Sequence, residues 1–190
     1  HLLEEGFRVL VLAGTKEKIY DQLNLGAYAL GYVVLANPIR ENAKSTFNYF
    51  AEQGVNIKVI SGDNPQTVSA VAKRAGITGA ERFIDANLLK TKEDLDQAVE
   101  SYTVFGRVTP DQKRRLVQAL KRKDHTVAMT GDGVNDILAM KSADCSIAMA
   151  SGSDAATQVA QVVLLDSDFG HMTQVVTEGR RVVNNVQRSA

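Results

Sequence analysis

Cysteine is nearly absent from this sequence of 190 residues, and neither an excess of one charge nor a long apolar run is present. The single cysteine, Cys145, excludes a disulfide within the chain and a zinc site with four thiolate ligands. Lys and Arg together number 22, as do Asp and Glu, and this balance argues against a protein built to coat nucleic acid. No uncharged apolar run reaches the roughly 18–20 residues of a membrane span. Since no signal peptide pattern opens the sequence either, we expect a soluble, cytoplasmic segment.

Hydrophobic residues make up 44% of the chain, which is enough to fill a core. Two apolar runs, at 8–13 and 29–36, predict antiparallel strands. After Asn37-Pro38, helical and strand patterns alternate. We expect helices at 39–53, 64–76, 91–102, 110–123, 134–142 and 154–160 and from 169 onward, with strands at 55–60, 103–105, 126–130, 145–149 and 162–165. This alternation predicts an α/β fold in which helices cover both faces of a parallel sheet.

Local signals mark two of these helix starts. Asn64 before Pro65 is typical of a cap followed by a proline in the first turn, and Thr91 with Asp94 has the spacing of a capping box. In an open parallel sheet, ligands bind beyond the carboxyl ends of the strands. The polar residues that we expect at that edge are Ser61-Gly62-Asp63, the GDGVND string at 131–136, Arg107, and Lys113 on the following helix.

The chemistry of these residues suits a phosphate and a hard cation. Two carboxylates at a glycine-rich strand end, Asp132 and Asp136, are typical of Mg²⁺ ligands. The hydroxyl of Ser61 could donate to a phosphoryl oxygen, and Lys113 could neutralise one. Each residue also has an ordinary explanation, as a turn residue, a helix cap or a solvated charge. Their order along the chain favours a site.

Five strings in this order resemble the haloacid-dehalogenase-like phosphotransferases, and among them the P-type cation-transporting ATPases. The strings are NPIR (37–40), VISGDNPQTVSAVA (59–72), VFGRVTPDQK (104–113), MTGDGVNDILAMKSADCSIAMASGSDAA (129–156) and VVLLDSDF (162–169). The resemblance implies a Rossmann-like phosphorylation domain with three layers around a parallel sheet.

The resemblance also implies a role for each matching residue. It implies that Asp132 holds Mg²⁺, with Asp136 beside it. The other expected roles are phosphate contact by Ser61, Gly62 and Lys113, support of metal and phosphate by Asn135 and Asp136, and ATP contact by Asp63, Arg107 and Arg8. Ser61 stands where the family usually has Thr, and the hydroxyl is kept.

By the same resemblance, residues 1–36 are the end of a nucleotide-binding domain, 37–175 the phosphorylation domain, and 176–190 the start of a stalk helix. The parent would be an ATP-driven cation pump of the cell membrane, anchored by helices outside this sequence. Its expected partners are ATP and a transported cation, for which VISGDNPQTVSAVA favours calcium. We expect no nucleic acid, since the basic residues of 107–123 fit a solvated helix face.

Two departures from the family pattern affect this interpretation. Asn37 stands where the family commonly has the Asp of an Asp-Pro-Pro-Arg hinge. The family's nucleophile, the Asp of an Asp-Lys-Thr-Gly-Thr string upstream of the nucleotide-binding domain, occurs nowhere in these residues. We therefore expect a sheet without its nucleophile strand, and no phosphoryl transfer by this chain alone.

Two other functions remain open from the sequence. VVLLDSDF resembles the nucleophile signature of the wider superfamily, so that Asp166 as nucleophile and Asp168 as acid would make a free-standing phosphatase. A non-catalytic module that binds Mg²⁺ and nucleotide is the second alternative. The position of VVLLDSDF after GDGVND argues against the phosphatase.

Overall fold

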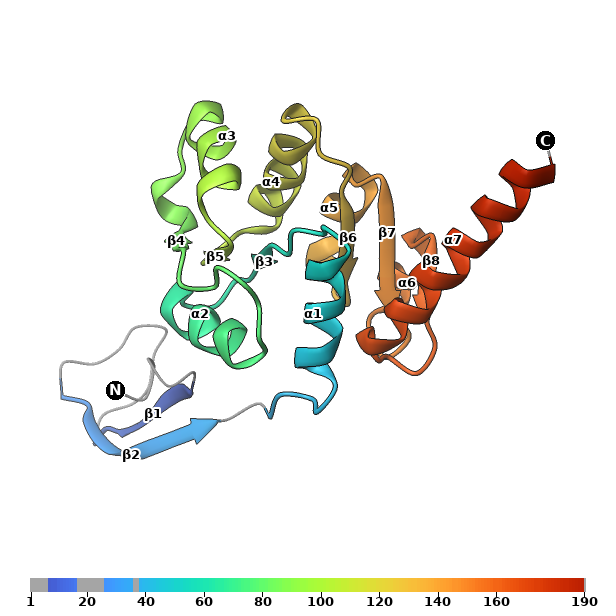
Figure 1. The fold of residues 1–190 in the computed structure, drawn as a ribbon. Helices are drawn as coiled ribbons and strands as arrows, with labels where there is room; N and C mark the ends of the chain where they lie inside the picture. Colours follow the sequence, from blue (N-terminus) through green and yellow to red (C-terminus); the bar gives the residue numbers. More distant parts are fainter. Residues whose placement is uncertain (1–6, 17–25, 36–37, 190) are drawn as a thin grey trace.

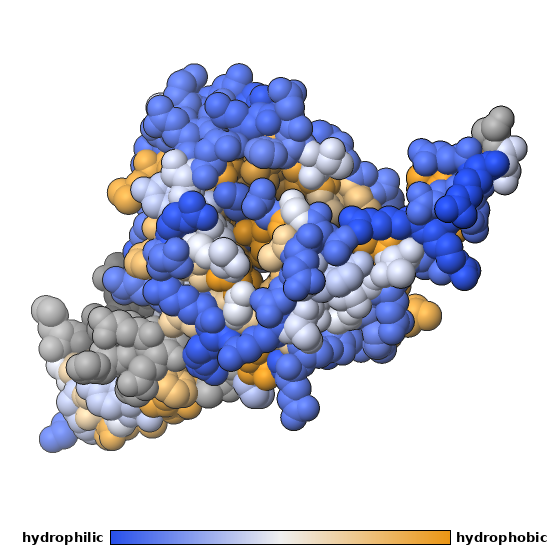
Figure 2. Space-filling view, in the orientation of Figure 1, coloured by the Kyte–Doolittle hydropathy of each residue, from blue (hydrophilic) through white to orange (hydrophobic). Residues whose placement is uncertain are grey.

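An antiparallel hairpin opens the part of the chain that the computed structural model describes, which comprises residues 7–16, 26–35 and 38–189, with only the backbone of Arg8. Its strands, β1 (Arg8–Gly14) and β2 (Tyr28–Leu35), pair as the sequence predicts (Figure 1). Apolar side chains on both faces of the hairpin are exposed: Leu10, Val11, Leu12, Tyr28, Leu30, Tyr32, Val33, Val34 and Leu35. Figure 2 shows apolar surface over the hairpin. Strands with this composition are usually covered on both faces.

The remaining strands form two parallel sheets of three strands each. They are β3 (Val59–Ile60), β4 (Phe83–Asp85), β5 (Val104–Gly106), β6 (Ala128–Gly131), β7 (Cys145–Met149) and β8 (Val162–Leu164). The strand orders are β3-β5-β4 and β6-β7-β8. The α/β class with parallel strands is therefore confirmed. Among the described strands, β3 and β6 are sheet edges without a second partner.

Helices surround these sheets. They are α1 (Ala43–Glu52), α2 (Pro65–Arg74), α3 (Lys92–Ser101), α4 (Pro110–Arg122), α5 (Ile137–Ser142), α6 (Asp154–Val159) and α7 (Met172–Ser189), with short 3₁₀ turns at Ala86–Leu88, Val134–Asp136 and Phe169–His171. Both predicted caps are present. The Asn64 side chain accepts from the backbone N–H of Gln66 at 2.9 Å, and Thr91 and Asp94 form a reciprocal capping box.

Besides small shifts of element ends, three differences from the sequence prediction bear on the fold. Helix α1 begins at Ala43 rather than at 39, because the chain first turns through a hydrogen bond from the Ala43 N–H to the Arg40 carbonyl. Strand β3 is limited to two residues, since its partner β5 begins only at Val104. Strand β4 was not predicted, and in the structure it is defined by its parallel pairing with β5.

Helix α4 joins the two sheets. Leu116 is buried in the core formed with α3 and β5, whereas its neighbour Val117 is buried in the core formed with β6, β7 and α5. Leu120, one turn further, packs against both cores. Because α4 packs against one sheet through one face and against the other sheet through a second face, it sets the distance between the two sheets. It thereby sets the width of the space between β3 and β6.

Helix α7 projects from the rest of the chain (Figure 1). Its first residue, Met172, is buried, whereas Val182, Val183 and Val186 are exposed. Neither α7 nor any other helix in the described ranges has the length and apolar character needed to cross a membrane.

Candidate functional site

A cavity of about 400 Å³ lies between the carboxyl ends of β3 and β6. Its lining consists of Ile60, Ser61, Gly62, Lys113, Met129, Thr130, Gly131, Asp132, Asp136 and Met149. Five of the residues singled out from the sequence therefore meet in one space: Ser61, Gly62, Lys113, Asp132 and Asp136. They come from both sheets and from α4.

Lys113 and Asp136 form an ion pair across this cavity. The Lys113 Nζ donates to Asp136 Oδ1 at 2.6 Å, and the two side chains are 14% and 9% exposed. The position of Lys113 is fixed by the start of α4, where Thr109 and Gln112 form a capping box. Charge pairs with so little solvent access interact more strongly than surface pairs.

Gly131 lets the backbone pass close to Asp136. A Cβ added at Gly131 would lie 2.5 Å from the Asp136 Cβ, which is closer than van der Waals contact allows. The backbone N–H of Gly133 donates to Asp136 Oδ2 at 3.3 Å. Both carboxylate oxygens of Asp136 are therefore engaged within the protein.

Asp132, in contrast, is exposed and no protein partner of its carboxylate lies within the described residues. Its oxygens remain available for a cation. No group of three or more His, Cys, Asp or Glu side chains suited to a metal ion occurs in the described parts of the chain. Mg²⁺ needs only one or two protein carboxylates and keeps several waters. The free carboxylate of Asp132, with the Asp136 carboxylate in the same cavity lining, therefore has donor chemistry that suits Mg²⁺.

Ser61 occupies the loop that follows β3. Its Oγ accepts from the backbone N–H of Asp63 at 3.1 Å, and its own hydroxyl proton remains free to donate. The Asp63 carbonyl in turn accepts from the N–H of Arg107 at 2.8 Å. The loops after β3 and β5 are thus joined through their backbones.

Arg107 stands outside the cavity lining, and its side chain is held by an acid that the sequence analysis missed. Arg107 Nη1 donates to Asp85 Oδ2 at 2.6 Å, and the Arg107 backbone has a φ of 52°. The pKa of Asp85 is lowered, first by the hydrogen bond from the Asn87 N–H and then by Arg107. The sequence pattern that could have indicated Asp85 is an acid directly after the apolar pair Phe83-Ile84, as at the end of a short strand.

Two further predicted residues do not line the cavity. Asp63 and Asn135 are exposed and are not part of its lining. The side chain of Arg8 and the whole of Asn37 lie outside the described residues.

Asp166 and Asp168, the acids of the phosphatase alternative, follow β8. Strand β8 is two strands away from β6, a separation of about 10 Å at ordinary strand spacing. Asp166 forms an ion pair with His171, and Asp168 accepts from Asn42 Nδ2 at 2.9 Å. Neither acid lines the cavity that holds Lys113 and Asp132.

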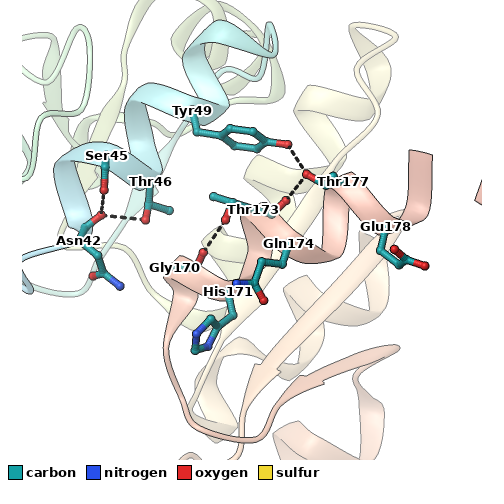
Figure 3. Close-up of a pocket in the computed structure, with 10 residues that line it drawn as sticks. All are labelled: Asn42, Ser45, Thr46, Tyr49, Gly170, His171, Thr173, Gln174, Thr177 and Glu178. Atoms are coloured by element: carbon teal, nitrogen blue, oxygen red, sulfur yellow. Dashed lines mark hydrogen bonds between the residues drawn. The ribbon is translucent and has the colours of Figure 1, made fainter. Parts of the chain in front are cut away.

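A larger groove of about 820 Å³ lies between α1 and α7 (Figure 3). Hydroxyl groups dominate its walls, and Tyr49 and Thr177 meet across it with their oxygens 3.2 Å apart. The ionisable groups of its lining are His171, Glu178 and the Tyr49 phenol, and the lining includes neither a lysine nor an aspartate. We therefore assign the chemistry to the smaller cavity.

Comparison with known proteins identifies the family. The family described as haloacid dehalogenase-like hydrolase matches residues 4–144. The probable cation-transporting ATPase exp7 of Streptococcus pneumoniae is 48% identical over 191 residues, which covers 99% of this chain and 24% of that protein. The calcium-transporting ATPase CtpE of Mycobacterium tuberculosis is 50% identical over 188 residues, covering 98% of this chain and 23% of that protein.

Solved structures show the same fold. A zinc-transporting PIB-type ATPase in its E2.Pi state aligns with 98% of this chain and 25% of that chain, at a TM-score of 0.69 and 23% identity. The catalytic domain of the CPx-ATPase CopB-B aligns with 87% of this chain and 57% of that chain, at a TM-score of 0.60 and 24% identity.

The chain thus spans about a quarter of the length of the curated relatives above. The resemblance to P-type cation-transporting ATPases that the motifs indicated extends over almost all of it. With more than half of its residues matched by the family, the chain belongs to the haloacid dehalogenase-like hydrolases.

Proposed function

We propose that this chain is the phosphorylation domain, with the end of the nucleotide-binding domain, of an ATP-driven cation pump of the cell membrane. The observation that carries the proposal is the meeting of Ser61, Lys113, Asp132 and Asp136 around one cavity at the carboxyl ends of β3 and β6. This arrangement suits the binding of a phosphoryl group and Mg²⁺.

Four of the cavity residues would have a task in phosphoryl transfer. Asp132 would hold Mg²⁺, which when bound offsets the negative charge of the phosphoryl oxygens. The Lys113 ammonium supplies a second positive charge, and its pairing with Asp136 keeps it pointed at the cavity. The Ser61 hydroxyl would donate to a phosphoryl oxygen, while the same Oγ accepts a hydrogen bond from the Asp63 N–H. Preorganised charges of this kind stabilise the transferring group without further reorganisation.

The acceptor of the phosphoryl group would come from a segment outside this sequence. Strands β3 and β6 are both edges, each with a single partner among the described strands. Unpaired edges of parallel strands readily accept another strand. A strand placed between them would complete one continuous sheet, and its carboxyl end would deliver an Asp into the cavity. This is the position that we propose for the missing Asp-Lys-Thr-Gly-Thr segment.

The flanking parts fit the same parent. Residues 1–36 would be the end of a nucleotide-binding domain. The rest of that domain would cover the apolar hairpin of β1 and β2, which is exposed on both faces. Arg107, exposed beside Asp63, would reach ATP. Residues 176–190, within α7, would begin the stalk that leads to the membrane.

We further propose calcium as the cargo of the parent. The string VISGDNPQTVSAVA and the names of relatives such as the calcium-transporting ATPase CtpE of Mycobacterium tuberculosis, at 50% identity, support this proposal. The residues that would select a cation lie outside this chain.

The test is to restore the missing strand. The purified chain is incubated with Mg²⁺ and acetyl phosphate, with and without a synthetic peptide in which an apolar strand precedes Asp-Lys-Thr-Gly-Thr, and intact masses are recorded. We expect one phosphoryl group on the peptide and none on the chain. Asp132→Asn should abolish the transfer, whereas Asp124→Asn, in the exposed turn that follows α4, should leave it unchanged.

The two alternatives give different results. Phosphorylation of the chain without peptide, lost in Asp166→Asn, would establish the phosphatase instead. Binding of Mg²⁺ with no phosphorylation of chain or peptide would establish a non-catalytic module.

A further inference from the structure

A short loop, residues 150–153, runs directly behind the backbone of Asp132. The N–H of Ser153 donates to the Asp132 carbonyl at 2.7 Å. A Cβ added at Gly152 would lie 2.4 Å from the same carbonyl oxygen. Only glycine permits this approach, since any side chain there would push the loop and Asp132 apart.

The other side of the loop is held by the turn that follows β8. The N–H of Ser151 donates to Ser167 Oγ at 2.8 Å, and the N–H of Ala150 donates to the Leu164 carbonyl at 3.0 Å. Ser167 has a φ of 56°, a left-handed conformation that few residues other than glycine adopt. The loop is therefore fastened at both ends, to Asp132 and to Ser167.

The residue after Ser167 ties this turn to the starts of two helices. Asp168 accepts from Asn42 Nδ2 at 2.9 Å, just before α1, and from the N–H of Gly170 at 2.8 Å, just before α7. Asn42 and Gly170 face each other at one end of the groove between these helices (Figure 3). Hydrogen bonds thus lead step by step from Asp132 to the base of α7.

We propose that Gly152 and Ser167 are positioning residues that set the location of Asp132 from the α7 side. The loop transmits a displacement of the turn at Ser167 to the Asp132 backbone, and the Asp132 carboxylate moves with it. The metal affinity of Asp132 then depends on how the base of α7 is placed. This inference rests on the proposed role of Asp132 as the Mg²⁺ ligand.

The test uses the whole chain and a variant that removes one hydrogen bond without straining the backbone. Ser167→Gly deletes the Oγ acceptor, and glycine accommodates the positive φ. Asp124→Gly is the matched control, because Asp124 also has a positive φ of 60° but lies in the turn after α4. Both substitutions relieve the same kind of backbone strain, and only one touches the loop.

Two measurements are made on each variant. The first is the hydrogen exchange rate of the Ser153 amide by NMR, which reports its bond to the Asp132 carbonyl without any metal. The second is the affinity for Mn²⁺ by electron paramagnetic resonance. In Ser167→Gly we expect Ser153 to exchange about 3- to 10-fold faster and Mn²⁺ to bind about 3- to 10-fold more weakly, the effect of one hydrogen bond. Asp124→Gly should change neither quantity.

The outcomes separate this inference from the proposed function. Equal Ser153 exchange in the two variants overturns the link through the loop, whatever the metal does. Faster exchange with unchanged Mn²⁺ affinity overturns the positioning role. If wild-type and Asp132→Asn chains bind Mn²⁺ alike, the metal role of Asp132 in the proposed function fails, and the positioning of a metal site fails with it.

Discussion

The side chains of Lys113 and Asp136 belong to different structural units and yet form an ion pair of 2.6 Å. Lys113 lies on α4, in the capped first turns that follow β5, whereas Asp136 ends the turn that follows β6. Both side chains have little solvent access. The pair therefore links the two sheets at the cavity. It also orients the Lys113 ammonium group, which the proposed chemistry requires.

Removing the lysine should destabilise the chain. In Lys113→Met, the Asp136 carboxylate keeps its buried position without its counter-charge, and we expect a loss of about 1–3 kcal/mol in the free energy of unfolding. Lys121→Met is the control, because the Lys121–Asp144 pair on the same helix is 40% and 37% exposed and should cost about 0–1 kcal/mol. Urea denaturation of both variants gives the comparison. Equal losses would mean that the pair at the cavity is no stronger than a surface pair.

Gly106 should tolerate no side chain. A Cβ there would lie 2.4 Å from the Pro65 Cα, so that Gly106→Ala must displace α2 from β5. We expect a loss of about 1–3 kcal/mol, the usual cost of overpacking. Gly179→Ala, in α7 with open space around the new methyl group, should instead stabilise the chain by about 0.5–1 kcal/mol. Thermal unfolding that moves both variants in the same direction would contradict this prediction.

Acid should weaken the turn between β8 and α7. The pKa of Asp168 is lowered, first by the Gly170 N–H and then by Asn42, with desolvation opposing them. A lowered folded-state pKa means that the stabilisation is present above the unfolded pKa of about 3.9 and is lost as the pH falls through the folded value. Unfolding free energies measured from pH 7 to pH 3 should therefore fall most steeply below about pH 4, and less steeply in Asp168→Asn. A carboxyl NMR titration that places Asp168 at its ordinary pKa would rule this out.

Elements with local signals could be predicted from the sequence. Helix α2 begins where the Asn64 cap and Pro65 indicate, and α3 begins at the Thr91 capping box. Cap and turn preferences act over three or four residues, so that a single sequence displays them. The lining of the cavity by Ser61 and Lys113 also agrees with the sequence prediction, because strand ends converge at one edge in a parallel fold.

Features that depend on distant pairing could not be predicted. The family resemblance implied a sheet without its nucleophile strand, but nothing local to β3 or β6 shows which strands pair in each of the two sheets. Asp85 meets Arg107 only because β4 pairs with β5. The contact of Gly152 with Asp132 likewise joins two loops that no spacing rule connects.

The open edges of β3 and β6 bear on the order in which the parent would fold. In our proposal, the strand between them belongs to a segment that precedes this chain, so that the ribosome would release it long before either edge exists. Pairings between distant segments form slowly, and an unpaired strand is prone to wrong partners while it waits. Completion of the sheet would therefore have to wait until β6 emerges, and the early strand would stay without its neighbours during that part of synthesis.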